Sequence, residues 1–164
     1  MDIEKNISIV EKQEELLIFP HFDRKDAWEL GQLMVSRIME EQLVLSACIR
    51  LSSGLVLFQY MPEGTNANNE SWMNRKFNIV RDLELSSLLY TLRLDHKQQT
   101  LEERGLDPRL YAKSGGGFPI RIAGTGVIGA VIVSGQPHLV DHEFLVESLS
   151  RFLSIPYVPR IPEA

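Results

Sequence analysis

The sequence predicts an α+β protein, in which helices pack against an antiparallel β-sheet of about four or five strands. Two pairs of β-rich segments are each joined by a short glycine-containing turn. Such turns favour antiparallel hairpins, because a parallel pair needs a crossover of a dozen or more residues. Amphipathic helical segments precede, separate and follow these pairs. The length of 164 residues, with 44% hydrophobic and 24% charged, is typical of a single soluble domain over 1–164.

The first expected elements are two helices. Residues 6–19 mix apolar and charged side chains in a pattern typical of a short helix, which Pro20 ends. A second helix begins at Asp23, a favourable N-cap residue, and continues to about Glu41. Its apolar residues recur at steps of three and four and define one buried face: Ala27, Leu30, Met34 and Ile38.

The middle of the chain is expected to form a hairpin, a loop and a long helix. Residues 43–52 and 55–61 are β-rich and flank Ser53-Gly54, which predicts the hairpin. Polar and turn-forming residues make 62–71 the clearest loop. The pattern from 71 to 104 is helical.

Two residues predict where that helix is interrupted and where it ends. Asp82 marks a kink or a restart within it. Gly105, with Pro108 beyond it, is a good stop signal.

A second hairpin and a last helix complete the chain. Residues 117–123 and 127–135 are predicted strands around the turn Gly124–Gly126. The last helix is expected from about 141 to 153. Residues 155–164 contain three prolines and are expected to form a non-helical tail.

The spacing of Gly124, Gly126 and Gly129 matches G-x-G-x-x-G, the dinucleotide-binding fingerprint. That motif needs a helix after its glycines, because the helix N-terminus holds the pyrophosphate. Here the next residues are "AVIVSG", a short β-branched segment. We therefore interpret the first two glycines as a hairpin turn and Gly129 as a point of close approach between backbones.

The segment "GGGFPIRIAGTGVIGAVIVSG" (115–135), followed by an acidic start to an amphipathic helix, resembles the C-terminal half of the haem-degrading HbpS-like superfamily, which includes GlcG-type proteins. "ESWMNRKFNIV" (70–80) is similar to one branch, of the UPF type, many of whose members have no assigned activity. The resemblance implies an α/β/α sandwich of profilin-like appearance, and homo-oligomers that are dimers or larger rings. It also implies haem or corrinoid binding in some members. No haem ligand of the superfamily matches a residue here, so the cofactor stays unknown, with haem as the candidate.

Composition excludes several classes of partner. The net charge of -5 provides no basic excess to neutralise phosphates, so nucleic acid is not an expected partner. No apolar run approaches the ~20 residues of a membrane span, and the N-terminus lacks the pattern of a signal peptide. We expect a cytoplasmic protein. Cys48 stands alone in an apolar segment and is expected to be buried.

Two groups of residues are candidate ligand-binding sites. Lys113, Ser114 and the glycines Gly115, Gly116 and Gly117 can form a loop whose backbone amides bind an anion; the alternative is a bend that leads into a strand.

The second group is Trp72, Arg75 and Lys76, which fall within one helical turn and can present an aromatic ring and two cations to an acidic ligand. The alternative places Trp72 in the core or an interface, with the cations solvated or paired with Glu70 or Asp82.

His138 and His142 are weak candidates for metal or haem ligands, being four residues apart. The expected helix start at Asp141 leaves His138 outside the helix, so exposed or capping roles are favoured for both.

Three functions remain open. The leading one is an oligomeric binding protein for a small acidic or tetrapyrrole ligand. The others are an enzyme that uses Lys113 or His142 as acid or base, and an adaptor that binds a protein partner through residues 155–164.

Overall fold

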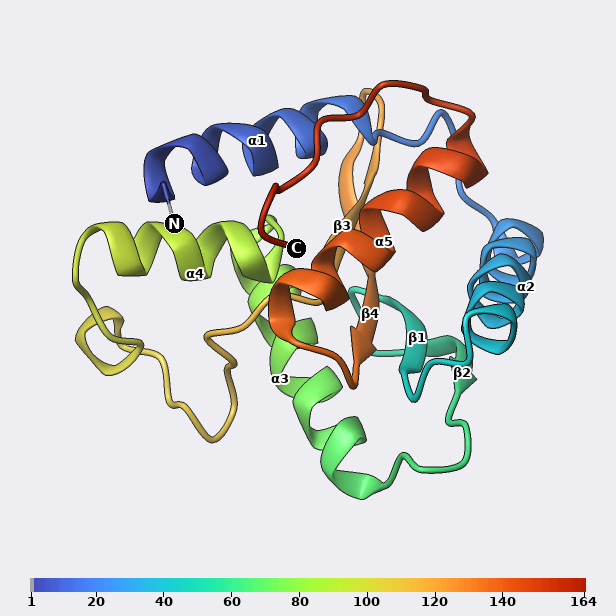
Figure 1. The fold of residues 1–164 in the computed structure, drawn as a ribbon, viewed down its shortest axis with the longest axis horizontal. Helices are drawn as coiled ribbons and strands as arrows, with labels where there is room; N and C mark the ends of the chain where they lie inside the picture. The colour runs from blue at the N-terminus through green and yellow to red at the C-terminus, as the bar shows by residue number, and fades with distance from the viewer. Residues whose placement is uncertain (1) are drawn as a thin grey trace.

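The computed structural model describes residues 2–164 and shows an α/β/α sandwich around a four-stranded antiparallel sheet (Figure 1). The elements are α1 (Ile3–Leu16), α2 (Arg24–Glu40), β1 (Ser46–Leu51), β2 (Val56–Tyr60), α3 (Ala67–Leu83), α4 (Ser87–His96), a 3₁₀ turn (Glu102–Arg104), β3 (Gly117–Ile122), β4 (Gly126–Ser134) and α5 (His138–Leu153). The strand order is β2-β1-β4-β3. The predicted fold class is therefore confirmed, with four strands.

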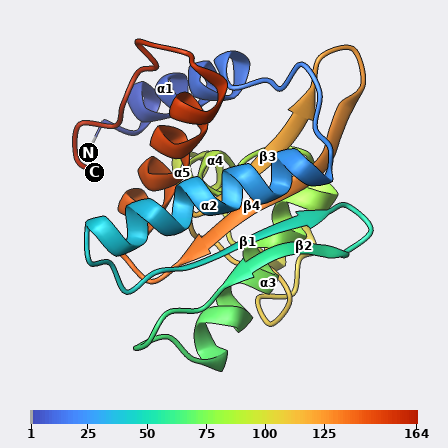
Figure 2. The ribbon, with the colours of Figure 1, turned by 90° about the vertical axis from the view of Figure 1, so that its right-hand side faces the viewer.

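Helices cover both faces of this sheet. Helices α2 and α5 lie on one face (Figure 2). There the predicted apolar stripe of α2 packs against alternate residues of the strands. Helix α3 lies on the other face, with Met73, Phe77 and Val80 against Cys48 and Ile132. Cys48 is buried there, as expected from its apolar segment. Helices α1 and α4 pack on each other beside the sandwich.

Both predicted hairpins form. The second hairpin turns at Gly124–Gly126, and Gly129 lies inside β4 opposite Leu51 of β1. A Cβ atom on Gly129 would lie closer to the carbonyl oxygen of Arg50 than any real contact allows. The residue thus permits close approach of β1 and β4, and no helix follows it that could bind a pyrophosphate.

Helices α1 and α3 differ from the predicted ones at their ends. Helix α1 begins at Ile3 rather than residue 6, because the Asp2 side chain accepts a hydrogen bond from the amide of Lys5. Helix α3 begins at Ala67 rather than residue 71, because Asn66 caps it. The helix expected up to residue 104 breaks at Glu84, which adopts a left-handed conformation.

The last helix also needs a correction, since it begins at His138 rather than Asp141. The Asp141 side chain instead accepts a hydrogen bond from the amide of Gln136. The predicted capping start of α2 is confirmed, since the side chains of Asp23 and Asp26 each accept from the other's backbone amide. The tail after α5 is non-helical, as predicted.

Candidate functional site

A cavity of about 280 Å³ opens between the first turns of α3 and α5, and we call it the α3/α5 cavity. Four of the residues singled out from the sequence line it, together with others that include Asn69 and Asp141. These four are Trp72, Lys76, Ser114 and His138. The cavity lies beside the C-terminal end of β4, since Ser134 also lines it. The fold thus brings residues from three separate segments of the sequence to one site.

An ion pair between Lys76 and Asp141 forms the inner wall of this cavity. The Nζ atom of Lys76 lies 3.0 Å from Oδ2 of Asp141 and donates to the carbonyl oxygen of Val133 at 2.9 Å. Both side chains are almost completely buried. Burial lowers the pKa of Lys76 and raises the pKa of Asp141, while the contact between them opposes both shifts. The alternative in which Lys76 pairs with Glu70 or Asp82 is therefore wrong.

The glycine loop packs behind the cavity. The amide of Gly115 donates to Nδ1 of His138 at 3.1 Å, and the amide of Gly117 donates to Oγ of Ser87 at 2.9 Å. Gly116 has a φ of +120°, and a Cβ atom there would lie 2.7 Å from Nζ of Lys76. Two of the three amides expected to bind an anion are therefore already paired inside the protein.

His138 is the first residue of α5, and its ring is oriented by that contact with Gly115. Burial, followed by the nearby Lys76, lowers the pKa of His138 below its usual value, so the ring is neutral near pH 7. A neutral ring whose Nδ1 accepts a hydrogen bond carries its proton on Nε2. His138 therefore offers the cavity a hydrogen-bond donor.

His142 lies in the core, so the expectation that it is exposed or capping is wrong. The ring is completely buried, and its Nε2 lies 2.7 Å from Oε1 of Gln13. Burial lowers the pKa of His142 to about 3. Its Nδ1 has no hydrogen-bond partner among residues 2–164. His138 therefore lines the cavity and His142 lies in the core, although both belong to α5.

The remaining cations predicted for a site do not line the cavity within the described residues. Arg75 stacks on the ring of Trp72, with 3.9 Å from Cζ to the ring centroid. Lys113 forms an ion pair with Asp95 at 2.5 Å. Both cations therefore lie near the site but are engaged elsewhere.

Sequence reasoning missed the first turn of α3. Asn68 and Asn69 line the cavity, although they fell in the predicted loop 62–71. The spacing of Asn66 and Asn69 was the available signal, because the two residues form a capping box. The N-terminal ends of α3 and α5 therefore meet at one cavity.

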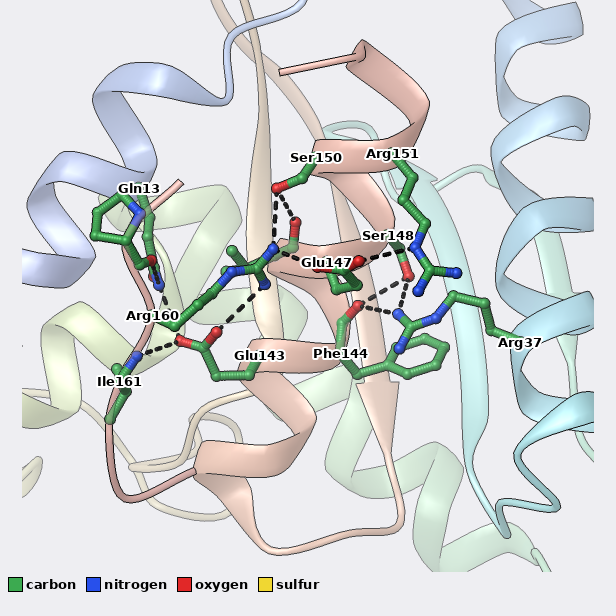
Figure 3. Close-up of polar contacts among 12 residues, drawn as sticks. Gln13, Arg37, Glu143, Phe144, Glu147, Ser148, Ser150, Arg151, Arg160 and Ile161 are labelled. Atoms are coloured by element: carbon green, nitrogen blue, oxygen red, sulfur yellow. Dashed lines mark hydrogen bonds and ion pairs between the residues drawn. The ribbon is translucent and has the colours of Figure 1, made fainter. Parts of the chain in front are cut away.

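A second cavity, of about 410 Å³, lies between α2, α5 and the C-terminal tail (Figure 3). Its charged side chains are paired with one another. Arg160 contacts the carboxylates of Glu143 and Glu147, and Arg37 contacts Glu41 while its guanidinium covers the ring of Phe144 at 4.2 Å. This cavity therefore offers apolar surface and satisfied charges.

The contacts of the tail extend this network. The amide of Ile161 and the side chain of Gln13 both donate to Glu143, and Gln13 also donates to the carbonyl of Pro159 (Figure 3). Val158 and Ile161 are buried. The tail is bound to its own chain, which leaves less of it available to a protein partner.

Neither a metal cluster nor a membrane-spanning helix occurs in the part of the chain that the structure describes. Residues 2–164 contain no group of three or more His, Cys, Asp or Glu side chains placed to hold a metal ion. None of the helices formed by those residues has the length and apolar character that crossing a membrane requires.

Comparison with known proteins links the chain to one family. The profile described as "Haem degrading protein HbpS-like" matches residues 22–150. A UPF0303 protein of Serratia proteamaculans (strain 568) is 42% identical over 156 residues, which cover 94% of this chain and 96% of that protein.

Solved structures share the fold. The crystal structure of the Ybr137w protein matches with a TM-score of 0.83 and 23% identity, covering 94% of this chain and 95% of that one. The crystal structure of a PduOC:Heme complex matches with a TM-score of 0.66 and 15% identity, covering 80% and 94%. At these identities the two likenesses show the fold alone.

Proposed function

Because this chain belongs to the haem-degrading HbpS-like family, we propose that it is a binding protein whose ligand is a small acidic molecule held in the α3/α5 cavity. The observation that carries the proposal is that two helix N-terminal ends meet at this cavity. The N-terminal end of a helix carries a partial positive charge and attracts anions. No side chain within the described residues caps α5, so the cavity is next to an uncapped helix end.

The polar groups that line the cavity favour a ligand rich in hydrogen-bond acceptors. Trp72, Ser114 and His138 line the cavity, and their side chains carry an indole N–H, a hydroxyl and an imidazole Nε2–H, all of which are hydrogen-bond donors. The carboxylate of Asp141 is occupied by Lys76 and by the amide of Gln136. A ligand carboxylate therefore meets donors, while the acidic wall is neutralised by its partner.

The size of the cavity also favours a small ligand. Its volume of about 280 Å³ lies just below the ~300–1,000 Å³ of typical small-molecule pockets. A compact carboxylate fits this space better than a complete tetrapyrrole.

Haem is the second candidate, supported by the description of the family and by the fold shared with the PduOC:Heme complex. The histidines do not fit the role of axial ligand. Binding iron through Nε2 of His138 would move its proton to Nδ1, which faces the N–H of Gly115. His142 is buried against Gln13. We therefore expect any tetrapyrrole to be bound through a propionate, with no iron ligand from these two residues.

We also propose that the protein is cytoplasmic and forms a homo-oligomer, as expected from the sequence. An acid–base role is disfavoured for the two residues considered for an enzyme, because Lys113 is paired with Asp95 and His142 is completely buried in the core.

The experiment is a fluorescence titration of the purified protein with succinate, citrate and haemin, and with succinamide as an uncharged control of similar shape. The protein has two tryptophans, of which Trp72 lines the cavity and Trp28 does not. We expect a saturable change with a carboxylate in the wild type and in Trp28→Phe, and none in Trp72→Phe. His138→Leu should weaken binding about tenfold, the equivalent of one hydrogen bond to a charged group.

The matched control is His96→Leu, which removes a histidine that is exposed and lies outside the cavity lining and should bind as the wild type does. Equal affinity for succinate and succinamide, or equal affinity of His138→Leu and wild type for every ligand, would overturn the proposal. If haemin gives a saturable absorbance change that persists in the His138→Leu, His142→Leu double variant, the result would favour haem as the ligand, bound without these histidines.

A further inference from the structure

A further cavity, of about 240 Å³, lies beside α4, and we call it the α4 cavity. Its lining follows the helix, since Leu83 and Leu85 come before the first residue of α4, and Gln99 and Arg104 come after the last one. Figure 1 shows the end of α4 and the turn that follows it at the outer edge of the molecule, away from the sheet. Among the described residues, the α4 cavity and the α3/α5 cavity share none. The α4 cavity is therefore a separate candidate site.

One part of the lining is apolar. Leu94 is buried in the cavity wall. Leu83, Leu85 and Tyr90 line the same cavity and are half-buried. Leu83, Tyr90 and Leu94 also belong to one cluster of packed side chains, which contains the buried Leu101. These side chains form an apolar wall held in place by its own packing, and an apolar group that covers it removes that surface from water.

The charged part of the lining is cationic. Arg93, Lys97 and Arg104 line the cavity, and no Asp or Glu among residues 2–164 does so. Glu102 and Glu103, which precede Arg104 in the sequence, lie outside the lining. The whole chain has 22 acidic residues and only 17 Lys and Arg, so a cavity lined by cations alone departs from the average charge of the protein. Cations gathered in this way attract an anion.

Two of these three cations have no ionic partner. Arg93 contacts Oε1 of Glu11 at 2.8 Å. The ion pairs formed within residues 2–164 include neither Lys97 nor Arg104. In the cavity between α2, α5 and the tail, by contrast, the arginines are paired with glutamates. Lys97 and Arg104 are therefore available to a ligand.

The end of α4 explains only part of this arrangement. The C-terminal end of a helix carries a partial negative charge and favours nearby cations. Arg93 in the last turn and Lys97 at the C-cap fit that role. Arg104 comes from the separate 3₁₀ turn, so the charge of the helix end does not explain why it lines the same cavity. A bound anion accounts for the cations from both segments.

We propose that the α4 cavity binds the anion of a medium-chain fatty acid, with the acyl chain against the leucines and the carboxylate between Lys97 and Arg104. The apolar wall favours an acyl chain over a small hydrophilic anion, because each buried methylene group adds to the affinity. The volume of about 240 Å³ lies below the ~300–1,000 Å³ of typical small-molecule pockets. A short acyl chain, such as that of octanoate, therefore fits better than a long one.

The test is a ¹H–¹⁵N NMR titration of the full chain with octanoate below its micelle concentration, alongside octanol and acetate. Octanol keeps the acyl chain and acetate keeps the carboxylate. We expect saturable shifts with octanoate at the amides of 83–85 and 94–104. Octanol and acetate should each bind at least about tenfold more weakly, and Arg104→Gln should weaken octanoate binding about tenfold, the equivalent of one hydrogen bond to a charged group.

The matched control is Arg24→Gln, which removes an exposed arginine outside the cavity lining and should bind octanoate as the wild type does. Octanol that binds as tightly as octanoate, or an Arg104→Gln variant with wild-type affinity, would contradict the proposal. So would the absence of saturable shifts at 83–85 and 94–104. Octanoate shifts confined to the Trp72 indole would place the ligand in the α3/α5 cavity, which would reject the α4 site and leave the function proposed above intact.

Discussion

Lys76 and Asp141 are 65 residues apart in the sequence, yet their side chains form a buried ion pair at 3.0 Å that joins α3 to α5. The pair fixes the two helix ends that border the α3/α5 cavity. It also fills the space next to Gly116, where a larger residue would collide with Nζ of Lys76. The cavity therefore depends on a contact that lies beneath its surface.

Lys76→Met should be strongly destabilising. The substitution removes the cation and leaves the buried carboxylate of Asp141 without its partner, which costs about 3–5 kcal/mol. Urea denaturation measures the change in the free energy of unfolding. The control is Lys25→Met, whose exposed ion pair with Glu29 should be worth less than about 1 kcal/mol. Equal losses in the two variants would contradict a structural role for the pair.

His142 should make the protein less stable in mild acid. The unfolded ring binds a proton near pH 6.5, whereas the buried ring does so only near a pKa of about 3. Between these values the unfolded state binds more protons, so stability falls as the pH drops below about 6.5, by about 1.4 kcal/mol per unit. The difference in unfolding free energy between wild type and His142→Asn should shrink from pH 7 to pH 5. A constant difference would show that His142 titrates alike in both states.

Gly129→Ala should destabilise the sheet. The new Cβ atom would collide with the carbonyl oxygen of Arg50 in the neighbouring strand, and overpacking of this kind costs about 1–3 kcal/mol. Thermal unfolding followed by circular dichroism measures the effect. Ile128→Ala at the neighbouring half-buried position controls for changes to the same strand. A Gly129→Ala melting temperature equal to that of the wild type would mean that β1 and β4 lie farther apart.

Ile161→Ala should show that the tail is part of the fold. The side chain is buried beside Val10 and Leu88, so its truncation should cost about 2–5 kcal/mol. Tyr157→Ala changes a tail residue that is 98% exposed and should leave the unfolding free energy within about 0.5 kcal/mol. If both variants unfold like the wild type, the tail is free and the adaptor function regains support.

Local patterns in the sequence were enough to predict the fold class. The apolar stripe of α2, the Asp23 cap and the two short turns each depend on neighbouring residues, and each agrees with the structure. The break at Glu84 was harder to predict from the sequence. The conformation of the chain after this break depends partly on a distant residue, because the carboxylate of Glu14 accepts a hydrogen bond from the amide of Ser86 just before α4.

The candidate site was partly predictable, because some of its residues can be recognised from local patterns in the sequence. Trp72, Lys76 and Ser114 stand out by residue type and local spacing, and they line one cavity. The partner of Lys76 and the burial of His142 depend on single side-chain contacts that α5 makes with α3 and α1 in the folded protein. Such contacts join segments more than 60 residues apart, and periodicity in one segment carries no information about them.

The most direct test of the proposed binding site is a two-dimensional ¹H–¹⁵N NMR titration with succinate. The indole N–H signals of Trp72 and Trp28 serve as an internal pair, since Trp72 lines the cavity and Trp28 lies on α2. We predict saturable shifts of the Trp72 indole and of the amides at the start of α5, with the Trp28 indole unmoved. Shifts that do not saturate, or that appear equally at Trp28, would contradict a ligand site in the α3/α5 cavity.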